Sequence, residues 1–94
     1  MRRKILGYDK DLMMVSVEFK TGSVGPLHAH PHTQVTYIIS GSFDVQIGDE
    51  NKPLGAGDCY FIPPNVIHGV VAREDSALVD VFTPVREDFL APKG

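Results

Sequence analysis

The sequence predicts an all-β protein, a single domain folded as a sandwich or barrel. The dominant hydrophobic period is two, which is typical of a strand with one buried face. Short runs rich in β-branched and aromatic residues recur at intervals of about 8 to 12 residues, and turn-forming residues separate them. No helical period, internal repeat or low-complexity segment interrupts this pattern, and 94 residues suffice for one small domain.

Six strands follow from this pattern, in chain order. In the first, residues 12–19, the side chains of Met13, Val15, Val17 and Phe19 fall on one face. The other five are rich in β-branched and aromatic residues and cover residues 35–40, 43–48, 59–62, 68–73 and 77–83. Turns are predicted between the strands at residues 41–42, 48–52, 55–58, 63–65 and 74–76. The tail, residues 84–94, predicts one short helical turn at most.

The composition narrows the class of protein. An apolar fraction of 43% with 22% charged residues is typical of a globular domain. No apolar run approaches the roughly 18 to 20 residues that cross a bilayer, so we expect a cytoplasmic protein without a membrane partner. A net charge of -3 without a dense basic run argues against a nucleic acid partner. A domain of this size has a modest core, so burial against a second copy, as a homodimer, is expected.

Cysteine chemistry is also limited. Cys59 is the single cysteine, which excludes an internal disulfide and a zinc site built from several thiolates. It has no basic neighbour in the sequence that would lower its pKa, so we expect a small buried apolar residue. Tyr37, Tyr60 and Phe61 are expected in the core of the sheet.

The stretch HAHPHTQ, residues 28–34, predicts a metal site. On an extended segment the side chains of His28, His30 and Gln34 leave the same face, and His68 begins a later strand directly after a Pro-Pro-Asn turn. Four neutral nitrogen and oxygen groups can surround one divalent transition metal, and Ni, Zn, Fe and Mn all suit this set. His32 shares the same parity but is set off by Pro31, so we expect it at the rim or in a supporting position.

Two motifs resemble those of the cupin superfamily. Residues 22–41 read G-x5-H-x-H-x3-Q-x6-G, which resembles the first cupin motif in every spacing. Residues 57–72 read G-x5-P-x-N-x2-H-x3-A, which is similar to the second motif, with Asn65 in place of the usual glycine and Ala72 in place of the usual asparagine. The resemblance implies one domain over residues 1–94, folded as a double-stranded β-helix, a jelly-roll barrel. It also implies that His28, His30, Gln34 and His68 bind the metal inside the barrel; a barrel that has lost its metal is the alternative.

The glutamine indicates the kind of chemistry. Most metal cupins have glutamate where this sequence has Gln34, and a neutral amide leaves the cation with its full charge. Such a centre polarises substrate oxygens well and disfavours a higher oxidation state. The prediction is therefore a non-redox reaction that orients or isomerises a substrate.

Two charged residues near the end of the chain are candidates for catalysis. Asp80 lies between Val79 and Val81, and a carboxylate in an apolar strand is costly unless it is paired or hydrogen-bonded. If its face is the barrel interior, Asp80 is a general acid or base; the alternative is a structural bond to a neighbouring strand or turn. Arg86 follows the strand and is placed to bind a carboxylate at the barrel mouth, or else to pair with Glu87 or Asp88.

The segments PLHAHPH and DVFTPVRED, with the following FL, resemble a narrower group of small cupins from pectin and alginate degradation. Those proteins convert 4,5-unsaturated uronates to linear keto sugar acids. The resemblance implies that Asp80 and Arg86 are catalytic, and that Arg86 and Phe82 contact a small anionic sugar acid. We therefore expect a metal-dependent isomerase or ketonase. The alternatives are a module that binds a small anion without turnover and a metal-dependent cupin oxygenase.

Overall fold

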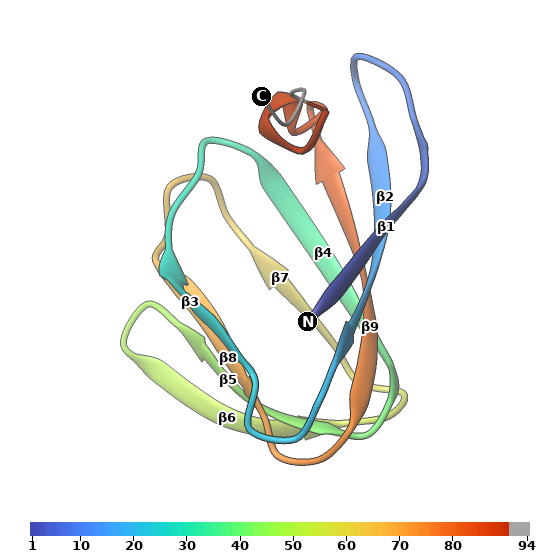
Figure 1. Cartoon of the computed structure of the whole chain (residues 1–94). Helices are drawn as coiled ribbons and strands as arrows, with labels where there is room; N and C mark the ends of the chain where they lie inside the picture. Colours follow the sequence, from blue (N-terminus) through green and yellow to red (C-terminus); the bar gives the residue numbers. More distant parts are fainter. Residues whose placement is uncertain (91–94) are drawn as a thin grey trace.

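Two antiparallel sheets face each other and enclose a barrel in the computed structural model, which describes residues 1–90 (Figure 1). The five-stranded sheet has the order β1-β2-β9-β4-β7, and the four-stranded sheet has the order β3-β8-β5-β6. The strands are β1 (Arg2–Tyr8), β2 (Met13–Phe19), β3 (Val24–His28), β4 (Thr33–Ser40), β5 (Ser42–Ile47), β6 (Glu50–Gly55), β7 (Cys59–Ile62), β8 (His68–Ala72) and β9 (Ser76–Thr83). The predicted all-β jelly roll is confirmed.

The six predicted strands correspond to β2, β4, β5, β7, β8 and β9, with ends that differ by at most two residues. Three further strands, β1, β3 and β6, were not predicted. All three are edge strands, where one side of the backbone needs no ladder partner, so their sequences tolerate charged residues and the prolines Pro26 and Pro53. The predicted turn at residues 48–52 is therefore too long, since β6 already begins at Glu50.

An apolar core fills one part of the barrel between the sheets. Phe19 of β2 and Phe43 of β5 meet edge to face, with ring centroids 5.1 Å apart, and so join the two sheets. Along β9 the inward positions are Ser76, Leu78, Asp80 and Phe82, so the core around Leu78 gives way to a polar region at Asp80. The buried apolar residues are Met13, Val15, Val17, Phe19, Ile38, Phe43, Val45, Ile62, Ala72, Leu78, Phe82 and Val85.

The expectation that Tyr37, Phe61 and Cys59 are buried is wrong. Tyr37 is 51% exposed, Phe61 is 54% exposed, and Cys59 is exposed as well. The strand period explains this, because Gln34 and Thr36 are buried on the inner face of β4 and Tyr37 must then face outward. Tyr60, one residue before Phe61, faces the interior and is half-buried.

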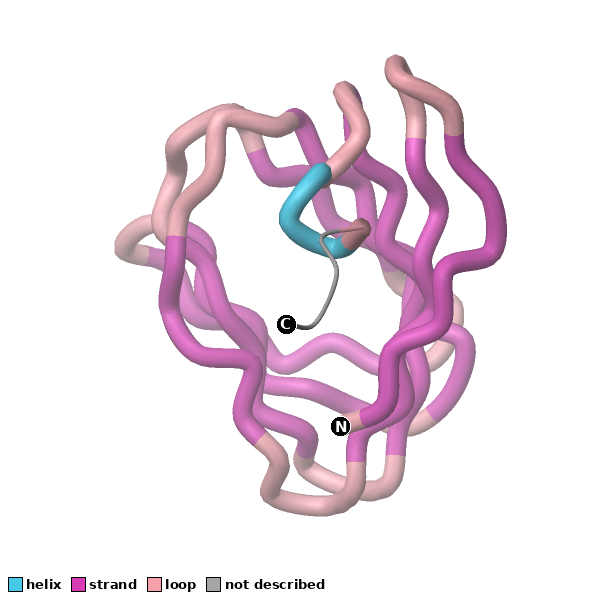
Figure 2. The backbone as a smooth tube through the Cα atoms, turned by 45° about the horizontal axis from the view of Figure 1, so that its top comes forward, coloured by secondary structure: helices cyan, strands magenta, loops and turns pink. Residues whose placement is uncertain are grey.

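The predicted helical turn in the tail is present as η1 (Glu87–Phe89), a short 3-10 helix. Figure 2 shows this turn across the opening of the barrel, and Phe89 packs edge to face on Phe82 with ring centroids 5.8 Å apart. The last part of the predicted tail, residues 91–94, lies outside the described residues. Among residues 1–90 no helix has the length and apolar character needed to cross a membrane.

Candidate metal centre

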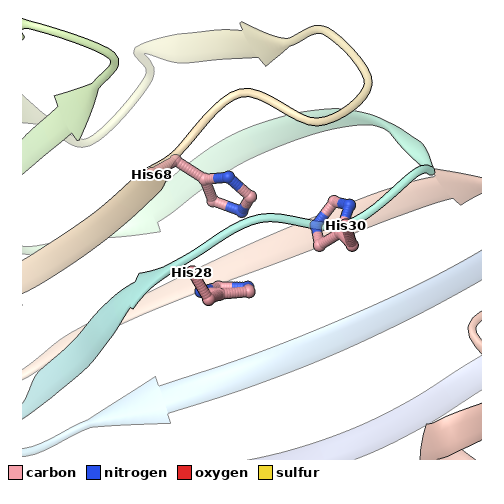
Figure 3. Close-up of side chains that lie close together, drawn as sticks. All are labelled: His28, His30 and His68. Carbon is pink, nitrogen blue, oxygen red and sulfur yellow. The ribbon is translucent and has the colours of Figure 1, made fainter.

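Three histidines from separate segments meet inside the barrel (Figure 3). His28 ends β3, His68 begins β8, and the two are direct partners in the antiparallel ladder, with ring centroids 4.4 Å apart. His30 lies in the loop before β4, with its ring centroid 4.8 Å from that of His68. Each ring offers one nitrogen, and these three nitrogens lie within 4.8 Å of one another. The three histidines are therefore positioned to hold one metal ion.

The extended segment predicted for His28 and His30 is interrupted, because β3 ends at His28. The turn before β8 holds His30 in place instead, because the backbone N–H of Asn65 donates to the carbonyl of His30 at 2.8 Å. Asn65 has a positive φ of 65°, a conformation that favours glycine and that asparagine tolerates better than most residues. This backbone angle accounts for the glycine usually found at the corresponding position of the motif.

Hydrogen bonds orient two of the rings. The Nδ1 atoms of His28 and His68 donate to the carbonyls of Pro26 and Val66, at 2.8 Å and 2.9 Å. Because a carbonyl accepts only, the proton lies on Nδ1 and the lone pair of Nε2 is free to bind a cation. His68 Nε2 is buried and has no hydrogen-bond partner among the described residues. Burial lowers the pKa of His68 to about 4 and also lowers the pKa of His30, so both rings are neutral and ready to bind metal at neutral pH.

Gln34 lies beside the trio, at the start of β4. Its side-chain nitrogen donates to Thr36 Oγ1 at 2.9 Å and to Asp80 Oδ1 at 3.1 Å. These two acceptors determine the orientation of the amide and direct Oε1 toward His30 Nε2, 3.0 Å away. In this arrangement Oε1 accepts a hydrogen bond from His30 Nε2. The carbonyl oxygen therefore lies next to the three histidines and would be available as a fourth ligand for a bound cation.

His32 does not join the three converging histidines. Its Nε2 hydrogen-bonds the carbonyl of Val85 at 3.2 Å, which ties the loop before β4 to the segment after β9. Three imidazoles with an amide oxygen are a donor set for a divalent transition metal, and the orphaned nitrogen of His68 fits that role. The residues present therefore fit a metal centre.

Asp80 is connected to the histidines through Gln34, which contacts both Asp80 and His30. Its Oδ1 accepts from Thr36 Oγ1 at 2.6 Å and from Gln34 Nε2 at 3.1 Å. Burial raises the pKa of Asp80 to about 6, and the two hydrogen bonds oppose that shift. The hydrogen bond to the neighbouring strand, one of the two alternatives from the sequence, is present, and Asp80 also lines the interior cavity. Its role as a general acid or base stays a prediction.

Arg86 contacts two aromatic rings and an acidic neighbour. It donates to Asp88 from Nη2 at 2.8 Å and from Nε at 3.3 Å, and its side chain is only 14% exposed. Its guanidinium carbon lies 4.1 Å from the ring centroid of Phe89 and 5.3 Å from that of Phe82. Arg86 therefore pairs with Asp88 and at the same time lies at the cavity.

One cavity of about 290 Å³ brings these groups together. This volume is close to the lower limit of about 300 Å³ for small-molecule sites. The predicted site residues that line it are His28, Gln34, His68, Asp80, Phe82 and Arg86. Sequence reasoning missed Arg3 and Phe89 as lining residues and placed Tyr60 in the sheet core; the period of two would have placed Arg3 inside if β1 had been recognised as a strand.

A jelly-roll barrel with three histidines gathered in its interior defines a metal-site cupin. The chain belongs to the cupin family: residues 15–82 match the family model described as Cupin domain. It is 46% identical over 91 residues to the pectin degradation protein KdgF of Dickeya dadantii (strain 3937), which covers 95% of this chain and 83% of that protein.

Solved structures agree with this assignment. The chain is similar to KdgF from Halomonas sp., with a TM-score of 0.90, 42% identity, and coverage of 93% of this chain and 81% of that chain. It is also similar to an RmlC-like cupin from Shewanella frigidimarina NCIMB 400, with a TM-score of 0.91, 45% identity, and coverage of 93% and 78%. The prediction from the sequence that the chain is a cupin is confirmed.

Proposed function

We propose that this protein is a metal-dependent, non-redox enzyme that converts 4,5-unsaturated uronates to linear keto sugar acids. The observation that supports it most directly is the position of Asp80, a half-buried carboxylate in the same cavity as two of the converging histidines and Arg86. The similarity to KdgF, a pectin degradation protein, supports the same substrate class, since pectin is a polymer of uronates. Such a reaction rearranges bonds within one molecule and requires no electron acceptor.

His28, His30, His68 and Gln34 would hold one divalent transition metal, with Ni, Zn, Fe and Mn as candidates. When bound, the metal supplies a Lewis acid that orients and polarises substrate oxygens. Gln34 adds no charge to this set, so the chain's own residues leave the cation fully positive. An anionic sugar acid would be attracted to such a centre.

Asp80 would move the proton. In the substrate the hydroxyl at C1 loses its proton, the bond between C1 and the ring oxygen breaks, and the ring oxygen takes up a proton, which produces an aldehyde at C1 and an enol at C5. Addition of a proton at C4 and loss of the enol proton then produce the C5 ketone, with no net change in atoms. Both hydrogen bonds to Asp80 are accepted by Oδ1, so within residues 1–90 Oδ2 has no protein partner and is the oxygen available for proton transfer. A pKa of about 6 suits a group that takes and returns a proton near neutral pH.

Arg86 would bind the substrate carboxylate. The bond to Asp88 uses one N–H of Nη2 and the N–H of Nε, which leaves the Nη1 donors of the guanidinium for a ligand. Phe82, 1% exposed, forms an apolar wall of the cavity against which the sugar ring would lie. The carboxylate would then be at the mouth and the reacting ring near Asp80.

The test follows the loss of the enol-ether absorbance when metal-loaded protein is mixed with an unsaturated uronate. Asp80→Asn should lower kcat by about 100-fold or more, the usual effect of losing a general acid or base, with the metal content unchanged. Asp49→Asn, an exposed change of the same kind, should have no effect and is the control. No acceleration by fully metal-loaded wild type would refute the proposal. Uronate bound and recovered unchanged would indicate a binding module, and oxygen consumption would indicate an oxygenase.

We propose in addition that the chain forms a homodimer through the outer face of the five-stranded sheet. Five apolar side chains on that face are between 43% and 54% exposed: Met14, Val35, Tyr37, Ile39 and Phe61. They are contiguous, since Val35 is paired with Phe61 on β7 and with Val81 on β9, which is itself paired with Met14. A continuous apolar surface of this kind is typical of an interface. Light scattering should find a dimer for wild type and a monomer for Tyr37→Lys with Phe61→Lys; a monomeric wild type would contradict the proposal.

A further inference from the structure

Arg3 lies on the inner face of β1, at the same cavity as Asp80. It pairs with Val17 in the ladder, and Val17 is a buried core residue, so Arg3 leaves β1 on the side of the barrel interior, where it lines the cavity and remains exposed to solvent. Arg2 faces the opposite side and pairs with Glu18, with an Nε–Oε2 distance of 3.8 Å. The two adjacent arginines therefore have different surroundings: one faces the cavity and the other faces solvent.

Arg3 and Arg86 both stack on Phe89. Their guanidinium carbons lie 3.8 Å and 4.1 Å from the ring centroid of Phe89, within cation–π range. The two carbons can thus be no farther apart than about 8 Å, which is short enough for one carboxylate, accepting at about 2.8 Å from each, to bridge them. The ring holds both guanidinium planes while their N–H edges stay available.

The two arginines differ in their partners. Arg86 is compensated by Asp88, whereas Arg3 has no ion pair and no side-chain hydrogen bond to any other residue in the range 1–90. Two cations close together repel each other unless an anion lies between them. Arg3 is thus a guanidinium without an ion-pair partner in residues 1–90, at a cavity lined by His28, His68 and Asp80, where it is available to an anionic group of a ligand.

We infer that Arg3 is a second carboxylate-binding residue, which shares the substrate carboxylate with Arg86 and makes β1 part of the substrate site. The identity of the substrate rests on the function proposed above; the position of the anion site does not. Arg3 would select sugar acids over neutral sugars and would contribute to binding of substrate and transition state equally. Its removal should then raise KM and leave kcat nearly unchanged.

The experiment compares Arg3→Gln with Arg2→Gln, a matched control that removes the same charge one residue away on the solvent side. Turnover of an unsaturated uronate should show KM raised about tenfold or more by Arg3→Gln, with kcat changed less than about threefold, and both constants unchanged by Arg2→Gln. Arg3→Lys keeps the charge and loses the bidentate geometry, so its KM should lie between those of wild type and Arg3→Gln.

A second readout requires no turnover. Calorimetric titration of metal-loaded protein with D-galacturonate, a saturated uronate, should give binding that Arg3→Gln weakens about tenfold or more and Arg2→Gln leaves unchanged, while neutral D-galactose binds all forms equally weakly. If wild type turns over the substrate but Arg3→Gln and Arg2→Gln behave alike, the role of Arg3 is refuted and the proposed function stands. If galacturonate binding depends on Arg3 and turnover is absent, the proposed function fails and the anion site stands. No galacturonate binding by wild type refutes the anion site.

Discussion

Thr36→Val tests whether the hydrogen bonds behind the histidines support the metal site. Thr36 is fully buried; its hydroxyl donates to Asp80 Oδ1 at 2.6 Å and accepts from Gln34 Nε2 at 2.9 Å. Valine has nearly the same shape but no hydroxyl, so both bonds are lost. A hydrogen bond to a charged group contributes about 1.5 to 3 kcal/mol, so the free energy of unfolding should fall by about 2 kcal/mol. For a domain of this size each kcal/mol corresponds to roughly 4 to 8 °C in Tm.

The same change should weaken metal binding. Without the hydroxyl, the amide of Gln34 keeps one acceptor, Asp80, instead of two, so Oε1 is less firmly directed toward His30. Loss of a supporting bond of this kind typically costs about 10- to 100-fold in metal affinity.

Two measurements check these values: chemical unfolding at pH 7 of the metal-free protein, and competitive metal titration against a chelating dye. Thr36→Ser is the control, because it keeps the hydroxyl and loses only a methyl group. The reasoning is refuted if Thr36→Val binds metal as tightly as Thr36→Ser.

Three further predictions concern the metal, a surface hydrogen bond and a turn. A divalent transition metal at 100 times its Kd should raise the free energy of unfolding by about 2.7 kcal/mol, a chelator should reverse this, and His68→Ala should abolish it; a metal-insensitive wild type in thermal scans would contradict the site. The backbone N–H and hydroxyl of Thr21 lower the pKa of Asp75, so this stabilisation is complete above the unfolded pKa of about 3.9 and is lost as pH falls through the folded value. Asp75→Ala should therefore lower the urea midpoint at pH 7, and a difference that fails to shrink below about pH 4 would contradict this. Gly41→Ala should destabilise far more than Gly57→Ala, as urea unfolding would measure: both have positive φ, but an added Cβ at Gly41 would lie 2.7 Å from the Asp75 carbonyl oxygen, whereas at Gly57 nothing lies within 4 Å.

Much of the barrel could be predicted because a strand with one buried face shows an alternation of apolar and polar residues in the sequence. In β2 apolar residues occupy every second position, so the strand and its inward face follow from the period alone. β9 has apolar residues on both faces, so the strand could be predicted but the inward direction of Asp80 could not. The spacing of His28, His30, Gln34 and His68 could likewise be read directly, and the structure gathers the three histidines with the amide beside them.

Three of the four edge strands, β1, β3 and β6, lack such a pattern, whereas the fourth, β7, was predicted. β1 is exposed at nearly every position, and β3 and β6 contain prolines that an edge position tolerates. Because β1 was not predicted, the inward direction of Arg3 could not be inferred. Thr36 is a further example: a threonine within an apolar strand is unremarkable in sequence, and only its position opposite Asp80 in the ladder makes it the partner of that carboxylate.

By itself the sequence determined the all-β class, most of the strands, the cupin motifs and the residues that could bind a metal, because each depends on spacing within a short segment. Only the tertiary structure decided which face of β4 is exposed, what Asp80 bonds, and that Arg3 and Arg86 meet over Phe89. These features depend on contacts between residues far apart in the chain. Such contacts are determined by strand pairing and by the path of the tail across the barrel mouth, neither of which a local pattern specifies.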